Sequence, residues 1–413
     1  MAKAKIKQRK DNKGRVLLKG ESQRKSDDLY IYTYIDFYGT RRYVYSMDLS
    51  VLREKKEQLL RDQMDGLDIY VGGKATINMT FDRYMSMKQN LRETTRSNYI
   101  YMYDKFVRNG FGDKLLTSVK YTDVQLFYYQ LLNEKGLAIN TLDNIHTVLN
   151  PLFKMAVRDD IIRKNPADGV LTEIKKNSGK NKGIRHALTL QQQNAFFDEI
   201  RYSPDYYHWY PLFATLLGTG MRISECTGLR WQDVDFKKRC ISVNHAVPYY
   251  TRNGVACFGV SMPKTETGIR TIPLMDEVYD VLLNEYERQK KDGFCSYELE
   301  GMSGFIFSNK YGSLHRPQCI NAAIKRIYES HNAREIIDAK REGREPVIIP
   351  HFSAHHLRHT FCSRLCEAEM NVKVIQQIMG HKDIKTTLDI YTEVCYEKQQ
   401  QALEDLSKKV NFF

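Results

Sequence analysis

The chain has 413 residues, enough for two or three domains, and 42% are hydrophobic and 27% charged, which excludes a disordered protein. Lys and Arg number 63 against 50 Asp and Glu, and the net charge of +13 favours a polyanionic partner, either nucleic acid or an anionic membrane surface.

The first residues are basic but no apolar run follows them, and no stretch approaches the roughly 18 apolar residues of a membrane span. We therefore expect neither a signal peptide nor a contact with the membrane. The eight cysteines show no CxxC spacing, which favours reduced thiols in a cytoplasmic protein over a disulfide framework.

Residues 1–72 predict a small three-stranded antiparallel sheet followed by a helix. The runs RVLLKG, LYIYTYIDFYG and TRRYVYSMDL are rich in aromatic and β-branched residues, and FYGT between the last two is a turn sequence. SVLREKKEQLLRDQMDGL then has helical periodicity. Two adjacent glycines, Gly72 and Gly73, predict a linker after this domain.

Residues 77–172 predict an all-α domain. Apolar residues recur at helical spacing in NLRETTRSNYIYMYDKFV and YTDVQLFYYQLLNEKG. A further helix is expected in NTLDNIHTVLNPLFKMAVRDDIIRKNP, with a break or kink at Pro151 and a stop at Asn165 and Pro166. The polar, basic residues 173–186 predict an interdomain linker.

Residues 187–413 predict a mixed α+β domain that is mainly helical. Thr189 and Gln192 have the spacing of a capping box at a helix start. CISVNHAV, GVSMP and RTIPLM are expected strands, with KTETG as a turn between the last two.

Two segments of this last domain carry residues that bind anions well. Arg222 and Glu225 are three residues apart, so on a helix the carboxylate can hold the guanidinium in place. Lys264 lies at the tip of the expected hairpin, where a mobile side chain can reach a ligand. Taken alone, an ion pair of this kind is common on the surface of a basic protein, and a lysine on a turn is usually only solvated.

A third segment, HHLRHT, places His355, Arg358, His359 and Cys362 on one stripe of a helix. One interpretation is a zinc site, but the glutamate of HExxH is missing and Arg358 would put a permanent positive charge beside the ion. An anion clamp fits better, because arginine offers a rigid fork of donors and histidine adds another. We therefore expect no metal and no cofactor.

The fourth segment contains His381 and, ten residues later, Tyr391. Together TGMRISECTGLRW, PKTETGIRTIPL, HHLRHTFCSRL and MGHKDIKTTLDIYT resemble the tyrosine recombinases, also called phage-integrase-type site-specific recombinases. The segments stand in the family's order and at its usual spacings. Residues 77–172 also resemble the family's core-binding domain, and the N-terminal sheet is similar to the arm-binding domain of integrases from conjugative transposons of Gram-positive bacteria.

The resemblance implies a catalytic set that acts on a scissile phosphate of DNA. Its members are Arg222, Lys264, His355, Arg358, His381 and Tyr391. In the family the tyrosine is the nucleophile, the two arginines bind the phosphate, and the hairpin lysine is the general acid for the leaving 5′ oxygen. The histidines match the first residue of the HxLRH block and the His-or-Trp position before the tyrosine.

Glu225 and His359 are expected to support this set. His356 stands where the family more usually has Asp, and the sequence assigns it no role. Arginine forks and imidazole donors can stabilise the extra charge of a pentacoordinate phosphorus without a metal. A phosphotyrosine keeps the energy of the broken phosphodiester, so that rejoining needs no ATP.

We therefore expect a three-domain integrase of a mobile element that binds double-stranded DNA at core sites and arm-type sites. The basic residues that are candidates for DNA binding are Arg15, Lys19, Arg24, Arg41, Arg42, Arg92, Arg96, Arg158, Lys182 and Arg185. The resemblance implies a homotetramer on two duplexes, with an excisionase and a host DNA-bending protein as further partners, at the nucleoid in the bacterial cytoplasm.

Two alternatives remain open. A type IB topoisomerase would use a similar residue set on one duplex, and a non-catalytic DNA-binding regulator would need only the basic surface. The additional N-terminal module favours recombination over the first, and the complete residue set argues against the second. The tail after Tyr391 packs either on its own domain or, as the resemblance implies, on a neighbouring protomer.

Overall fold

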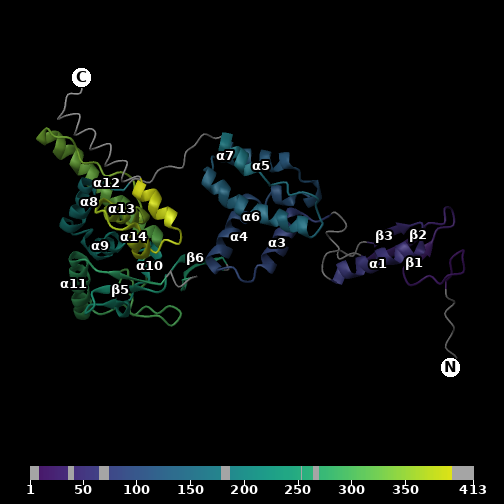
Figure 1. The fold of residues 1–413 in the computed structure, drawn as a ribbon, viewed down its shortest axis with the longest axis horizontal. Coiled ribbons are helices and arrows are strands. Elements are labelled where there is room, and N and C mark those ends of the chain that lie inside the picture. The colour runs from purple at the N-terminus through teal and green to yellow at the C-terminus, as the bar shows by residue number, and fades with distance from the viewer. Residues whose placement is uncertain are drawn as a thin grey trace, which may run out of the picture. The chain divides into compact units, whose positions relative to one another are not determined.

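A computed structural model of the chain describes residues 9–35, 41–64, 74–177, 187–252, 254–263 and 269–392. The chain divides into two compact units, Met1–Asn181 and Lys182–Phe413 (Figure 1). Within the described ranges, no helix is both long and apolar enough to cross a membrane.

The N-terminal part is a small antiparallel sheet with one helix packed on it, as the sequence predicts. Strands β1 (Glu21–Gln23), β2 (Tyr30–Ile35) and β3 (Arg41–Ser46) pair in chain order. Helix α1 (Leu49–Met64) packs against β2 and β3. The predicted FYGT turn, residues 37–40, lies outside the described ranges.

The first strand begins after RVLLKG rather than inside it, because the chain turns at Gly20. Gly20 has a φ of +87°, and a Cβ there would lie 2.7 Å from the ring of Tyr32. Glu21, the next residue, is fully buried and forms ion pairs with Arg53 (3.1 Å) and Lys56 (3.2 Å) of α1. This buried carboxylate joins the sheet to the helix.

The helical part of the first unit has one apolar core. Its helices are α3 (Ile77–Met87), α4 (Glu93–Phe106), α5 (Tyr121–Asn133), α6 (Ile139–Arg158) and α7 (Val170–Asn177). Leu149, Leu152 and Phe153 are buried on both sides of Pro151, and α6 continues through this proline instead of breaking. The burial of its apolar face outweighs the backbone hydrogen bond that proline cannot make.

Two further boundaries differ from the expectation. Helix α6 ends at Arg158, where Asp160 adopts a positive φ of 54°, and not at Asn165. Residues 173–177, assigned above to the linker, form the last turns of α7, because Ile174 is buried with Val170 and continues the apolar face of that helix. The rest of the expected linker, 178–186, lies outside the described residues.

The second unit is mixed α+β and mainly helical, as predicted. Its helices are α8 (Leu190–Tyr202), α9 (Tyr210–Thr219), α10 (Ile223–Thr227), α11 (Asp276–Asp292), α12 (Pro317–Glu342), α13 (Ala354–Glu367) and α14 (Val372–Met379). Strands β4 (Val234–Asp235), β5 (Cys240–Val243) and β8 (Arg270–Pro273) form an antiparallel sheet. The predicted capping box of α8 is present, with Thr189 and Gln192 bonded reciprocally.

A second hairpin, β6 (Tyr249–Arg252) with β7 (Val255–Phe258), was not expected from the sequence. Residues 259–263, expected as a strand, form only an isolated bridge between Ser261 and Ala246. The strand pairing instead uses the preceding segment, because Gly254 adopts a φ of +79° and turns the chain back on itself.

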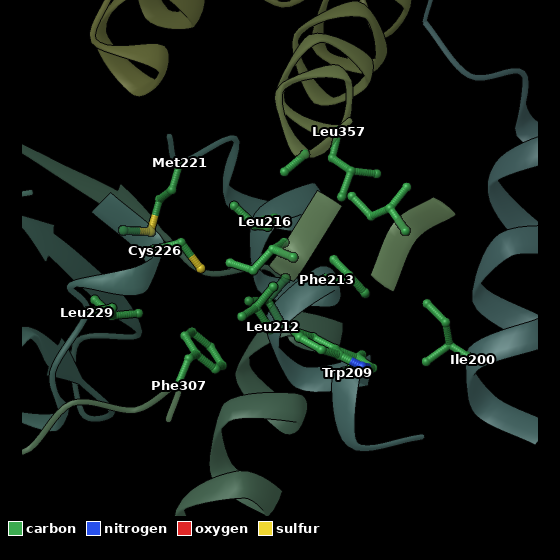
Figure 2. Packing of buried hydrophobic residues seen from close by; sticks show 14 of the residues in the cluster. Ile200, Trp209, Leu212, Phe213, Leu216, Met221, Cys226, Leu229, Phe307 and Leu357 are labelled. Atoms are coloured by element: carbon green, nitrogen blue, oxygen red, sulfur yellow. The ribbon is translucent and has the colours of Figure 1, made fainter. Parts of the chain in front are cut away.

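The core of this unit positions the ends of two helices. Figure 2 shows Leu212, Phe213 and Leu216 of α9 at the centre of the buried cluster, with Leu357 of α13 directed toward them. Helices α9 and α13 therefore pack directly against each other. The C-terminal end of α9 leads straight into Arg222, so this packing brings the GTGMR and HHLRH segments together.

Candidate active site

Arg222 occupies the N-cap of α10, and Glu225 holds it through both main chain and side chain. The amide nitrogen of Arg222 donates to Oε2 of Glu225 (2.8 Å), and its Nη1 donates to Oε1 (2.7 Å). The pair is therefore a capping arrangement and not two side chains along a helix face. The side chain of Arg222 remains 43% exposed and within reach of a ligand.

A residue that sequence reasoning missed, Arg270, holds the other side of the same carboxylate. From β8 it donates Nη2 to Oε2 of Glu225 (2.7 Å) and Nη1 to Oε1 (3.2 Å), and both side chains are buried. Burial alone would raise the pKa of Glu225, but hydrogen bonds from Arg270 and the charges of Arg270 and Arg222 lower it to about 2. Glu225 is therefore ionised at neutral pH.

One signal in the sequence points to Arg270. In a strand, alternate residues face the same side, so Arg270 shares the buried face with Ile272. An arginine on the apolar face of a strand needs a carboxylate partner, because an unpaired buried charge is strongly destabilising.

Arg358, on α13, is buried and directed into the same region. Its Nη1 donates to the carbonyl of Gly220 (2.6 Å) and its Nη2 to that of Met379 (2.5 Å). Burial, followed by the positive charge of Arg222, lowers the pKa of Arg358 to about 9. An incoming anion would relieve this repulsion.

The three arginines bind three consecutive carbonyl oxygens, those of residues 378–380. Nε of Arg270 donates to the first (2.8 Å), Nη2 of Arg358 to the second, and Nη2 of Arg222 to the third (3.1 Å). These carbonyls end α14, where unpaired acceptors and the helix dipole leave negative charge. Three cationic side chains from three separate elements therefore fix the segment that leads into His381.

His381 follows directly, with its ring in a polar setting. Its Nδ1 lies 3.0 Å from the hydroxyl of the buried Thr387. Burial, followed by repulsion from Arg358, Arg222 and Arg270, lowers the pKa of His381 to about 4. The imidazole is therefore neutral at physiological pH in the absence of a bound anion.

Tyr391 lies in the helical residues 384–392 and is partly buried. It packs against an apolar cluster formed by Phe361, Cys362, Cys366, Ile375, Met379 and Ile390. The same cluster contains residues of α13 and α14, so the segment that carries the tyrosine is anchored on the elements that carry Arg358 and precede His381.

The histidines of HHLRHT separate into different environments. His355 is exposed, whereas His356 and His359 are partly buried. His356 has a structural role that the sequence did not reveal: its Nδ1 accepts a hydrogen bond from the amide of Ser353 (3.1 Å) at the start of α13. His356 thus accepts the capping hydrogen bond that an aspartate, the more usual residue at this position of the family, would accept.

The described residues contain no group of three or more His, Cys, Asp or Glu side chains that could hold a metal ion. The zinc interpretation grouped His355 and His359 with Cys362, which is instead fully buried in the apolar cluster beside Tyr391.

The remaining candidates are dispersed. Lys264, Lys182 and Arg185 lie outside the described residues. Arg15 is bonded to Asp11, and Arg24 to Asp27. The other basic candidates are exposed (Lys19, Arg41, Arg158) or partly buried (Arg42, Arg92, Arg96).

The sequence pattern of the Phage integrase family matches residues 186–398, and that of the DNA binding domain of Tn916 integrase matches residues 5–63. The chain is 31% identical to the transposase from transposon Tn1545 of Streptococcus agalactiae and to that from transposon Tn916 of Enterococcus faecalis, each over 97% of both chains.

Among solved structures, that of the Tn1549 transposon integrase in complex with transposon right end DNA superposes with a TM-score of 0.68 at 29% identity, over 81% of this chain and all of that one. A lambda integrase dimer bound to a core site shares the fold, with a TM-score of 0.51 at 16% identity, over 77% of this chain and 95% of that one.

These matches define the class as tyrosine recombinases, enzymes that cut and transfer DNA strands. The chain belongs to the phage integrase family, and its relatives are integrases of conjugative transposons. The topoisomerase and regulator alternatives are not favoured by any of these similarities.

Proposed function

We propose that this integrase cuts DNA with Tyr391 as the nucleophile and rejoins it through a 3′-phosphotyrosine, without metal or ATP, in both integration and excision. The observation that carries the proposal is the convergence of Arg222, Arg358 and His381 at one helix end, ten residues before the tyrosine. The positive charges of Arg222, Arg270 and Arg358 outnumber the single negative charge of Glu225 that they surround, so the cluster suits a phosphate.

The two arginines would bind the non-bridging oxygens of the scissile phosphate. A guanidinium carries five N–H groups, so Arg222 and Arg358 can keep their carbonyl partners and still donate to an anion. Their charge opposes the negative charge that grows at phosphorus in the transition state. The same charge makes it easier for the tyrosine hydroxyl, with a usual pKa of about 10, to lose its proton.

His381 would donate a third hydrogen bond. If the hydroxyl of Thr387 donates to Nδ1, the imidazole proton stays on Nε2, where it is available for an oxyanion. His355 is exposed at the start of α13 and would add a further donor, and Lys264 would protonate the leaving 5′ oxygen. Glu225 and His359 would support these groups.

The domains would divide DNA recognition among them. We propose that residues 1–72 bind arm-type sites, and that residues 77–177 and 187–413 bind the core site and are joined by residues 178–186. The complexes of the Tn1549 integrase with transposon right end DNA and with a circular intermediate DNA support DNA as the partner. The basic candidates would contact phosphates, and binding would weaken steeply as salt rises.

Assembly and context follow from the same resemblance. We propose a homotetramer on two duplexes. An excisionase and a host DNA-bending protein would bias the direction of the reaction. The enzyme would act at the nucleoid in the bacterial cytoplasm.

A nicked suicide duplex that carries the element's end sequence tests the chemistry in EDTA. The wild type should form a covalent complex that survives SDS, Tyr391→Phe should not, and Tyr311→Phe, at an 82% exposed tyrosine of the same unit, should behave as the wild type. Formation of the covalent protein–DNA complex by Tyr391→Phe would show that another residue is the nucleophile. If EDTA abolished the covalent complex of the wild type, the interpretation of the histidines as metal ligands would be supported. A separate assay for strand exchange between two duplexes distinguishes a recombinase from a topoisomerase.

A further inference from the structure

Arg270 makes contacts that a residue holding only the sheet together would not need. It reaches from β8 to two other elements, with Nη1 and Nη2 on Glu225 of α10 and Nε on the carbonyl of Ile378 at the end of α14. All the partners adjoin groups of the proposed phosphate site. Glu225 binds Arg222, and Ile378 is three residues before His381.

The Glu225 carboxylate is held from both sides. Oε1 accepts from Nη1 of Arg222 (2.7 Å) and from Nη1 of Arg270 (3.2 Å), and Oε2 accepts from the Arg222 amide (2.8 Å) and from Nη2 of Arg270 (2.7 Å). Arg270 therefore supplies two of the four hydrogen bonds that fix the carboxylate. Without it, only Arg222 holds the carboxylate, so the two side chains can shift together and the direction of the Arg222 guanidinium changes.

The backbone is shaped to accept this arginine. Gly380 has a φ of +61°, and a Cβ there would lie 3.0 Å from Cδ and 3.1 Å from Nη1 of Arg270. The Arg270 side chain thus lies close to the residue whose carbonyl binds Arg222. A lysine at this position has no planar fork and cannot bind Glu225 and Ile378 together in the same way.

We propose that Arg270 is a positioning residue for strand cleavage: it sets the Glu225 carboxylate that aims Arg222, and it holds the α14 end that carries His381. The inference rests on the proposed recombinase chemistry. It places no contact between Arg270 and DNA, so its loss should slow the chemical step and leave DNA affinity unchanged.

The test compares Arg270→Lys, which keeps the buried positive charge, with Arg288→Lys as a control. Arg288 also binds a buried carboxylate, that of Glu285, but from an exposed position on α11. Single-turnover formation of the covalent complex is measured on the suicide duplex at saturating protein, beside the dissociation constant for the same DNA and the melting temperature. Arg270→Lys should cleave on the order of 10²-fold more slowly, the cost of misplacing a group by about 1 Å, with DNA affinity unchanged. Arg288→Lys should match the wild type.

The pH profile separates positioning from a general structural role. Hydrogen bonds from Arg270 help to lower the pKa of Glu225, and Arg270→Lys keeps the charge but loses this paired hydrogen bonding. The acid limb of the cleavage rate should therefore move to higher pH in Arg270→Lys and stay in place in Arg288→Lys. A slower rate with an unchanged profile, or with DNA affinity and melting temperature falling in parallel, would assign Arg270 to the fold alone. Cleavage by Arg270→Lys at the wild-type rate would overturn the inference while the proposed function stood.

A second readout needs no catalysis. The ¹⁵N resonances of the His381 imidazole, assigned through His381→Gln, should shift in Arg270→Lys and not in Arg288→Lys, because Arg270 holds the backbone three residues before it. Failure of the wild type to form a covalent complex would contradict the proposed function. Independently, unchanged ¹⁵N resonances of the His381 imidazole in Arg270→Lys would contradict the positioning role of Arg270.

Discussion

Glu225 and Arg270 form a two-point ion pair inside the protein, with Nη2 to Oε2 at 2.7 Å and Nη1 to Oε1 at 3.2 Å. Only 8% of the Glu225 side chain and 5% of that of Arg270 are exposed. Glu225 also binds Arg222, and both members of the pair interact electrostatically with Arg358. The carboxylate thus compensates a group of three positive charges that would otherwise repel one another.

Glu225→Gln should destabilise the second unit strongly. The change keeps the size of the side chain but leaves Arg270 buried without its counter-charge, and breaking a buried pair costs about 3–5 kcal/mol. Chemical denaturation of the two proteins measures the difference. Asp276→Asn removes an exposed partner of Arg239 and should change the free energy of unfolding by less than about 1 kcal/mol. Equal changes in the free energy of unfolding for the two substitutions would contradict the proposed compensation of the buried arginine charges by Glu225.

Acid should weaken the wild type more than Glu225→Gln. The pKa of Glu225 is about 2 in the folded protein against 4.5 in the unfolded chain, so the unfolded state takes up the proton first as pH falls. The contribution, about 3 kcal/mol by the ~1.4 kcal/mol per unit relation, is complete above pH 4.5 and is lost toward pH 2. Melting temperatures between pH 6 and pH 3 should therefore converge for the two proteins. Parallel curves would show that the carboxyl titrates normally.

His356→Ala should reduce stability without slowing cleavage. The ring accepts a hydrogen bond from the amide of the N-cap residue Ser353, and losing a capping hydrogen bond costs about 0.5–2 kcal/mol. His356→Asp should retain or exceed the wild-type stability, because a carboxylate accepts the same hydrogen bond and favours the helix N-terminus. Thermal unfolding measures the first effect, and covalent-complex formation should be unchanged in both variants. Slow cleavage by a stable His356→Asp protein would instead point to a direct role in the reaction.

Thr387→Val should slow cleavage through His381. Valine keeps the shape of the buried side chain but removes the hydroxyl that lies 3.0 Å from Nδ1, so the proton is no longer held on Nε2. The loss should not exceed the roughly 10²- to 10³-fold cost of removing one transition-state donor. Single-turnover cleavage at pH 7 measures it, and Thr387→Ser should restore most of the rate. A Ser variant as slow as the Val variant would assign the defect to packing.

Local patterns were sufficient for much of the fold. The alternation in β2 and β3, the periodicity of α4 and α5 and the capping box of α8 each depend on residues within a few positions of one another. Patterns failed where burial overrode a local preference. Pro151 was expected to break or kink α6, but the helix continues through it, with its apolar neighbours buried in the core.

The sequence by itself determined the family, the order of the four motifs and the Arg222 to Glu225 contact, since these depend on residue types at fixed spacings. Only the tertiary structure decided the use of Arg270 and the binding of residues 378–380 by three arginines. Those hydrogen bonds join positions 108 and 158 residues apart for Arg270 and Arg222, and no local pattern encodes them. Burial then set the charge states, because the same arginines lower the pKa of both Glu225 and His381 once packing brings them together.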